Sequence, residues 1–190
     1  MVQKIIQRSF LLLIAVGLCS MGALAQSSRN GNLDAHDSTF VKKAAQGNLA
    51  EVQLGHLALE KSSSPEVKKF AQRMIDDHSK AEDQLKQVAS EDNVTLPDSP
   101  NAEQKATKDR LEKLSGESFD RAYMKDMVTD HTKDVSEFKM EAKDAKNPAV
   151  KNYASQTAPI LESHLKEARS IAPQTAREGH KATTSASTSY

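Results

Sequence analysis

The spacing of apolar residues constrains the fold of this chain more than any other feature of its sequence. In four long segments, residues 38–61, 65–92, 117–146 and 148–171, apolar or small residues recur every three or four positions. This spacing places side chains on one face of an α-helix, and no stretch shows the alternation that is typical of a β-strand. A shorter polar helix is expected over residues 102–114. The sequence therefore predicts an all-α fold.

Short breaks separate the first two segments and the last two. Residues 62–65 read SSSP, which offers a hydroxyl N-cap followed by a proline in the first helical turn. Residues 147–148, Asn-Pro, form a tight break. The middle connection is longer, with a Pro-rich loop over residues 93–101 and a Ser-Gly bend at residues 115–116. These connections predict two antiparallel hairpins, for which a four-helix bundle is the economical arrangement.

The first 25 residues have the features of a secretory signal peptide, with cleavage expected after the Ala-Leu-Ala of residues 23–25. Lys4 and Arg8 flank the basic start, and an apolar run follows over residues 10–18. The run is too short to remain as a membrane anchor, and no transmembrane segment is expected in the mature chain. The sequence predicts an exported, periplasmic protein, with association to the cell envelope left open.

Cys19, the only cysteine, raises an alternative, which is a lipoprotein signal. The bulky Leu18 argues against lipidation, because the position before such a cysteine normally holds a small residue. Cleavage after Ala25 would remove Cys19, so the mature chain would form no disulfide and perform no thiol catalysis. The loss of Lys4 and Arg8 would change 26 basic and 26 acidic residues to 24 and 26, a net charge of about −2. Nucleic acid is not expected as a partner of such a chain.

Two flanking segments are polar and low in apolar residues. Residues 26–36 and 173–190 are expected to be disordered, because such segments bury too little apolar surface to offset the entropy lost on folding. The folded domain is expected over residues 37–172.

Histidines interrupt three of the apolar faces. His78, His131 and His164 each occupy a position on their helix where an apolar residue is expected. In residues 38–61, Glu51 lies on a face that is otherwise apolar or small. Counted from the hairpin turns at about 1.5 Å per residue, the four side chains fall near one layer of the bundle, close to the middle of the helices.

Two interpretations of this layer remain open. A buried carboxylate without a partner is costly, so Glu51 requires either a metal ion or the histidines. The first interpretation is a site for one transition-metal ion (zinc, iron, manganese or copper) with Glu51, His78, His131 and His164 as ligands. The second is a buried Glu–His hydrogen-bond network that is structural or senses pH.

Three further residues are weaker candidates. Asp77 and Asp130 each precede a histidine, and adjacent residues on a helix point about 100° apart. Both are therefore expected to form salt bridges at the boundary of the core or to orient an imidazole of a neighbouring helix. His56 lies on the face next to that of Glu51.

Three stretches resemble a known family. They read AEVQLGHLALEKSSSPEVKKFAQRMIDDHSKAEDQL, LSGESFDRAYMKDMVTDH and APILESHLKEA. Their order and spacing are similar to those of DUF4142, a bacterial family of exported proteins that are often labelled outer-membrane proteins and assigned to the ferritin-like superfamily. The resemblance covers residues 37–172 and implies a ferritin-like four-helix bundle, with no defined activity.

The ferritin-like di-iron pattern requires a Glu from each of two helices and a Glu-x-x-His from each of the other two. Here Ile75 and Leu161 stand three residues before His78 and His164, and His131 stands where the pattern has a Glu. The di-iron set is absent, and one Glu with three histidines suits a single ion.

The sequence leaves the activity open between two main hypotheses. The first is a periplasmic bundle that binds one metal ion. The alternative is a non-enzymatic bundle that binds a partner or an envelope component under stress, with a structural Glu–His network. Catalysis ranks last, because no nucleophile–base pair or phosphate loop accompanies the histidines.

Overall fold

The computed structural model describes residues 33–186, with side chains as far as Thr175. Five helices follow one another along this part of the chain, and it contains no strand, so the predicted all-α fold is confirmed. The helices are α1 (Ala35–Lys61), α2 (Pro65–Glu91), α3 (Ala102–Glu112), α4 (Gly116–Asp144) and α5 (Pro148–Ala186).

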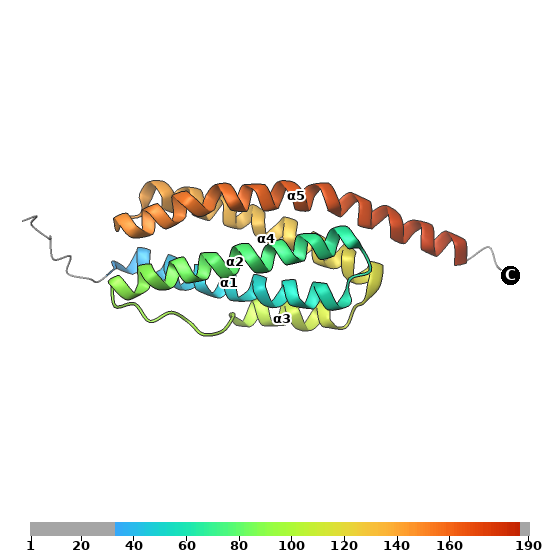
Figure 1. The fold of residues 1–190 in the computed structure, drawn as a ribbon, viewed down its shortest axis with the longest axis horizontal. Coiled ribbons are helices and arrows are strands. Elements are labelled where there is room, and N and C mark those ends of the chain that lie inside the picture. The colour runs from blue at the N-terminus through green and yellow to red at the C-terminus, as the bar shows by residue number, and fades with distance from the viewer. Residues whose placement is uncertain (1–32, 187–190) are drawn as a thin grey trace, which may run out of the picture.

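The four long helices lie side by side as a bundle (Figure 1). The α1–α2 hairpin packs along its length, and so does the α4–α5 hairpin; α2 also contacts α5, and α1 contacts α4. The short helix α3 lies in the long middle connection, against α1 and α4 (Figure 1). This placement of α3 covers one side of the bundle and shapes a cavity described below.

Side chains at the helix starts satisfy backbone N–H groups that a helix leaves free. Asp34 caps α1 by accepting from the N–H of Asp37, and Ser64 caps α2 just before Pro65. Asn101 and Gln104 form a reciprocal capping box on α3. The predicted bend at residues 115–116 is present, because Gly116 has a φ of +56°, a conformation that glycine adopts at little cost.

The apolar core is divided into two clusters, one toward each end of the bundle. Phe40, Phe138 and Tyr153 pack in one cluster, with the rings of Phe40 and Phe138 5.0 Å apart. Phe70, Phe119 and Tyr123 pack in the other. On α2, α4 and α5, the residues between the two clusters include one buried histidine each. The core therefore has a polar middle layer.

A buried carboxylate closes the end of the bundle where α4 turns into α5. Asp37 accepts hydrogen bonds from the backbone N–H groups of Lys146 and Asn147, the latter at 2.7 Å. Asn147 in turn caps α5 and donates from its side chain to Asp92 at 2.9 Å. The start of α1 and the end of α2 are thereby fixed to the second hairpin.

Two predicted boundaries differ from the structure. α5 continues through Pro173 to Ala186, so residues 173–186 form helix where the composition predicts a disordered tail. Proline removes one backbone hydrogen bond, but the Gln, Ala, Arg, Glu and Lys that follow favour helix. At the other end, α1 begins at Ala35, inside the predicted lead-in. The predicted signal peptide and residues 26–32 lie outside the described residues. Within residues 33–186, none of the helices combines the length and apolar character needed to cross a bilayer.

Two glycines inside α1 make a matched pair for a test of packing. A methyl group added at Gly47 would meet no atom within 4 Å, whereas at Gly55 it would lie 2.7 Å from Cγ1 of Ile75 and 3.0 Å from the backbone oxygen of Ala71. Gly47→Ala should raise the free energy of unfolding by about 0.5–1 kcal/mol through helix propensity. Gly55→Ala should lower it by about 1–3 kcal/mol, because α2 must move away. Urea unfolding of both variants measures this, and equal stabilities would contradict the packing of α1 on α2.

Candidate metal centre

Three histidines from three helices meet in the middle layer of the core. His78 on α2 is 5% exposed, and His131 on α4 and His164 on α5 are fully buried. Their ring centroids are 5.7, 5.5 and 5.3 Å apart. One nitrogen from each ring lies within 4.8 Å of those of the other two, a spacing at which the three side chains could hold a metal ion.

Each ring is held by a hydrogen bond from one of its nitrogens to an oxygen. His78 Nδ1 lies 3.1 Å from Oδ1 of Asn48, His131 Nδ1 lies 3.0 Å from the backbone oxygen of Met127, and His164 Nε2 lies 2.7 Å from Oδ2 of Asp77. A carbonyl or carboxylate oxygen only accepts, so we infer that these three nitrogens carry the hydrogen and donate. The hydrogen bonds therefore fix the neutral tautomer of every ring.

The other three ring nitrogens have no hydrogen-bond partner. His78 Nε2, His131 Nε2 and His164 Nδ1 are buried and unpaired. In the inferred tautomers each of them carries a free lone pair. One nitrogen of each ring lies within 4.8 Å of the other two, and we infer that these are the three unpaired nitrogens. A buried polar atom without a partner costs about 1–3 kcal/mol. This arrangement is what a metal ion needs from imidazole ligands, which bind through the unprotonated nitrogen.

Electrostatics keep the three rings neutral. Burial, with the neighbouring His131 and His164, lowers the pKa of His78 well below its ordinary value. Burial lowers the pKa of His131 to about 3. For His164 burial again lowers the pKa, although the hydrogen bond to Asp77 opposes it. The rings thus stay in the form that binds metal at neutral pH, without competition from protons.

Asn48 on α1 orients His78 and is a residue that the sequence analysis missed. Its Nδ2 donates to Oε2 of Glu82 and to the hydroxyl of Tyr153, at 3.3 Å each, so its Oδ1 is turned toward the imidazole. The available clue was its position on the apolar face of α1, one turn before Glu51 and one turn after Ala44.

Asp77 receives the hydrogen bond of His164 from across the α2–α5 interface. Arg73, one turn earlier on α2, lies 3.2 Å from the same Asp77 oxygen and 2.6 Å from Glu167 on α5. The structure thus brings Asp77 to a histidine of a neighbouring helix, one of the two arrangements expected for it. Asp130, the other aspartate of this kind, is half-buried and pairs with Lys133 at 3.9 Å.

Glu51 is not brought to the histidines. The carboxylate is 5% exposed, but it lines a separate cavity between α1, α3 and α4, and it is outside the group of potential ligands. Asn48 takes the position on α1 that faces His78. The structure thus groups the three histidines without the predicted fourth ligand. His56 is exposed and is also outside the cluster.

A second group of potential ligands lies at the end of the bundle. His36 is exposed and lies 2.9 Å from Oε1 of Glu141, with Asp37 beside them. Both oxygens of Asp37 already accept backbone hydrogen bonds from the α4–α5 turn. This group therefore serves the turn, and the three-histidine cluster is the stronger candidate.

Fold and site together define a helical bundle with a buried cluster that could hold a metal ion. The chain belongs to the DUF4142 family: the model of that family, described as a domain of unknown function, matches residues 22–171. The resemblance predicted from the three stretches is thereby confirmed at the level of the family.

A solved structure with a similar fold is the crystal structure of a DUF305 fragment from Deinococcus radiodurans. The two have a TM-score of 0.67 and are 16% identical in sequence, and the match covers 75% of this chain and 99% of that one. At 16% identity, the similarity shows a shared fold and gives no information about a shared function. No curated protein matches the chain.

His131 gives the cluster a signature in the pH dependence of stability. Its pKa is about 3 in the folded protein, against an ordinary value of 6.5. Between these values the unfolded chain binds a proton at His131 and the folded protein does not, so the free energy of unfolding should fall as the pH drops. One such proton contributes a slope of about 1.4 kcal/mol per pH unit.

The comparison of wild type with His131→Gln measures this contribution, because burial, the main cause of the lowered pKa values of His78 and His164, is kept in the variant. Urea unfolding in metal-free buffer, followed between pH 6.5 and about pH 4, should show a steeper fall for the wild type. Equal slopes would contradict the neutral, buried state of His131.

Proposed function

We propose that this protein binds one transition-metal ion through His78 Nε2, His131 Nε2 and His164 Nδ1. The observation that carries the proposal is the convergence of three buried, unpaired nitrogens whose rings are each held through the opposite nitrogen. The outer hydrogen bonds to Asn48, Met127 and Asp77 are of the kind that orient histidine ligands and increase their basicity.

A purely structural histidine network fits the same geometry less well. All three inward nitrogens are acceptors, and a single water molecule has only two hydrogens to donate, so one lone pair would stay unsatisfied. Protonating one ring would supply a donor, but burial lowers the pKa values of all three. A cation satisfies the three lone pairs at once.

The ligand set favours zinc or copper over harder cations. Three neutral imidazoles suit Zn²⁺ and copper, whereas magnesium, calcium and manganese prefer oxygen ligands. With metal–nitrogen bonds of about 2.0–2.1 Å, tetrahedral ligand nitrogens lie about 3.3 Å apart. Nitrogens within 4.8 Å of one another reach this spacing through small side-chain rotations. Three protein ligands leave one position for water or another small ligand.

We assign binding, rather than catalysis on an organic substrate, to this site. The cavity that reaches His78 has a volume of about 40 Å³, which is room for a few water molecules. A few waters or a partly hydrated ion fit in this space beside His78, and a metabolite does not. This supports a role in holding or transferring the metal.

We also propose that the bundle belongs to the ferritin-like class. Two antiparallel hairpins joined by a longer connection support this, and so does the buried site between the helices. The site itself departs from the di-iron type, because Ile75 and Leu161 stand where that type has glutamates.

We propose export to the periplasm, supported by the predicted signal peptide. Intact-mass measurement of the protein from the native envelope fraction should give a chain that starts at Gln26. Cys19→Ser should leave that mass unchanged. A lipidated chain that starts at Cys19 would contradict cleavage after Ala25, and an uncleaved chain would contradict export.

Metal binding is tested on protein without a histidine tag. After loading with Zn²⁺ and removal of excess, the wild type should retain one equivalent, and His131→Ala should retain none. Asp77→Asn should weaken the affinity about 10–100-fold, because it loses the charged partner of His164. Titration calorimetry and elemental analysis provide the measurement.

His56→Ala is the matched control, because it removes an exposed histidine outside the cluster and should bind as the wild type does. Metal should also raise the unfolding free energy of the wild type, by about 2.7 kcal/mol at a hundred times Kd. Wild-type protein that retains no stoichiometric Zn²⁺ or copper would overturn the proposal and leave the cluster as a structural network.

A further inference from the structure

An acidic cavity lies on the side of the bundle that α3 covers. It has a volume of about 290 Å³ and lies between α1, the start of α3 and α4. Five carboxylate residues and two lysines line it, namely Glu51, Glu103, Asp130, Asp134, Glu137, Lys43 and Lys133. The excess of carboxylates gives this cavity, here called the vestibule, a potential that attracts cations.

Glu51 is the feature of the vestibule that points to a cation. Its side chain is 5% exposed, and its Oε2 is buried without a hydrogen-bond partner. Burial raises the pKa of Glu51 well above its ordinary value, and the charges of Asp134, Asp130 and Asp126 raise it further. Burial, together with the charges of Asp130 and Glu137, raises the pKa of Asp134 to about 7. A positive charge in the vestibule would satisfy the free oxygen and relieve this repulsion.

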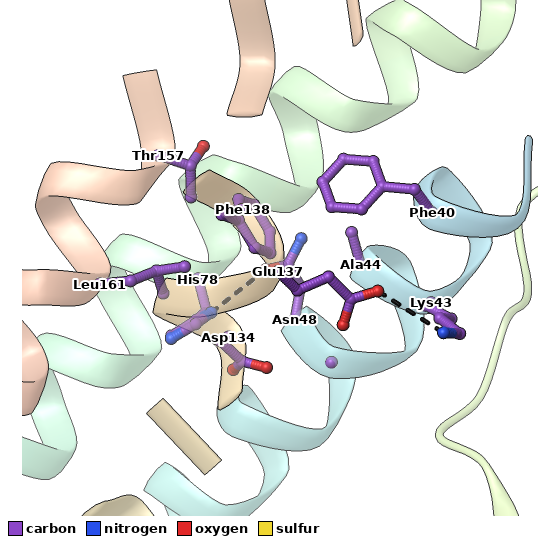
Figure 2. A pocket seen from close by; sticks show the side chains of 11 residues that line it. Phe40, Lys43, Ala44, Asn48, His78, Asp134, Glu137, Phe138, Thr157 and Leu161 are labelled. Carbon is purple, nitrogen blue, oxygen red and sulfur yellow. Dashed lines mark hydrogen bonds and ion pairs between the residues drawn. The ribbon is translucent and has the colours of Figure 1, made fainter. Parts of the chain in front are cut away.

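The vestibule shares a wall with the small cavity that reaches the histidines. Lys43, Gly47, Asp134 and Glu137 line both cavities. Asn48 and His78 also line the small cavity, and Figure 2 shows them with Asp134 and Glu137 around it. The two cavities therefore adjoin, and together they lie between the acidic surface and one ring of the three-histidine cluster.

Gly47 keeps the junction open. Nothing lies within 4 Å of where its Cβ would be, and it is the one glycine that lines either cavity. Lys43 and Glu137 form an ion pair of 3.5 Å at the same place, also drawn in Figure 2. The pair partly neutralises the lysine, which would otherwise repel an approaching cation.

We propose that the vestibule built on Glu51 is the route by which a divalent cation reaches the three-histidine cluster, with Gly47 as its opening and Asp134 and Glu137 at the passage between the cavities. This inference rests on the proposed metal binding and adds the route of uptake. Glu51 is then a residue that attracts and passes on the cation, not a ligand of its final site.

The proposed route predicts that substitutions along it change the rates of metal uptake and release but leave the affinity of the cluster for the metal unchanged. Uptake of Co²⁺ is followed by stopped-flow absorption, and release by transfer to excess EDTA. Gly47→Leu places a side chain in the opening, and close packing there should block the passage. Uptake and release of Co²⁺ should both become at least about ten-fold slower, while Kd stays within about two-fold of the wild-type value. Glu51→Gln should slow uptake about three-fold or more, and Lys43→Met should accelerate it, because steering depends on local charge.

Two matched controls accompany these variants. Gly47→Ala leaves the opening clear and should take up Co²⁺ at the wild-type rate. It gains helix propensity as Gly47→Leu does, so it separates that gain from the block of the opening. Glu91→Gln removes an exposed carboxylate at the end of α2, outside the vestibule, and should also leave the rate unchanged.

The outcomes separate the two proposals. If the wild type binds no Co²⁺ and also retains neither Zn²⁺ nor copper, metal binding itself is overturned, and the route with it. If the wild type binds, His131→Ala does not, and Gly47→Leu and Glu51→Gln take up Co²⁺ at the wild-type rate, the route alone is wrong. A loss of affinity in Glu51→Gln equal to that in His131→Ala would instead make Glu51 a ligand and overturn its assigned role.

Discussion

The hydrogen bonds that the three imidazoles donate to Asn48, Met127 and Asp77 are the interactions on which the rest of the site depends. Each bond uses one ring nitrogen, fixes the tautomer and turns the opposite lone pair inward. The three acceptors come from three different helices, α1, α4 and α2. Every long helix of the bundle therefore contributes to the cluster, and the hydrogen bond between His164 and Asp77 joins the two hairpins at this layer.

The polar layer has a cost that the two apolar clusters offset. Three unpaired nitrogens in the middle of a core oppose folding, and one apolar cluster on each side holds the helices together around them. The ties at the end of the bundle, through Asp37 and Asn147, add to this rigid frame. Such a departure from an apolar core is expected at a functional site, where stability is given up for binding.

The sequence predicts the histidines of the site well, but it predicts the residues that hydrogen-bond to them poorly. His78, His131 and His164 could be found because a spacing of three and four residues fixes the inward face of a helix, and counting from the turns fixes the height. For Asn48 the same spacing gives its place on the apolar face of α1 but not its role, since that role depends on Glu82 and Tyr153, which come from α2 and α5. The cavity that Glu51 lines could not be predicted either, because the position of α3, held by a long connection, does not follow from helical spacing. The continuation of α5 past Pro173 was missed because the polar composition there fits both a helix and a disordered tail.

One stretch of α1 joins the three parts of the proposed site. Gly47, Asn48 and Glu51 lie within about one helical turn, and at roughly 100° per residue they spread over about 100° of the surface of α1, which is wide enough to reach more than one neighbouring helix. Asn48 turns toward α2 and anchors His78, Glu51 turns toward α3 and α4, and Gly47 leaves the space between them free. A glycine inside a helix costs about 1 kcal/mol relative to alanine, and no close contact requires it here, in contrast to Gly55. The open junction between the vestibule and the histidines is the physical reason that the structure offers for this residue.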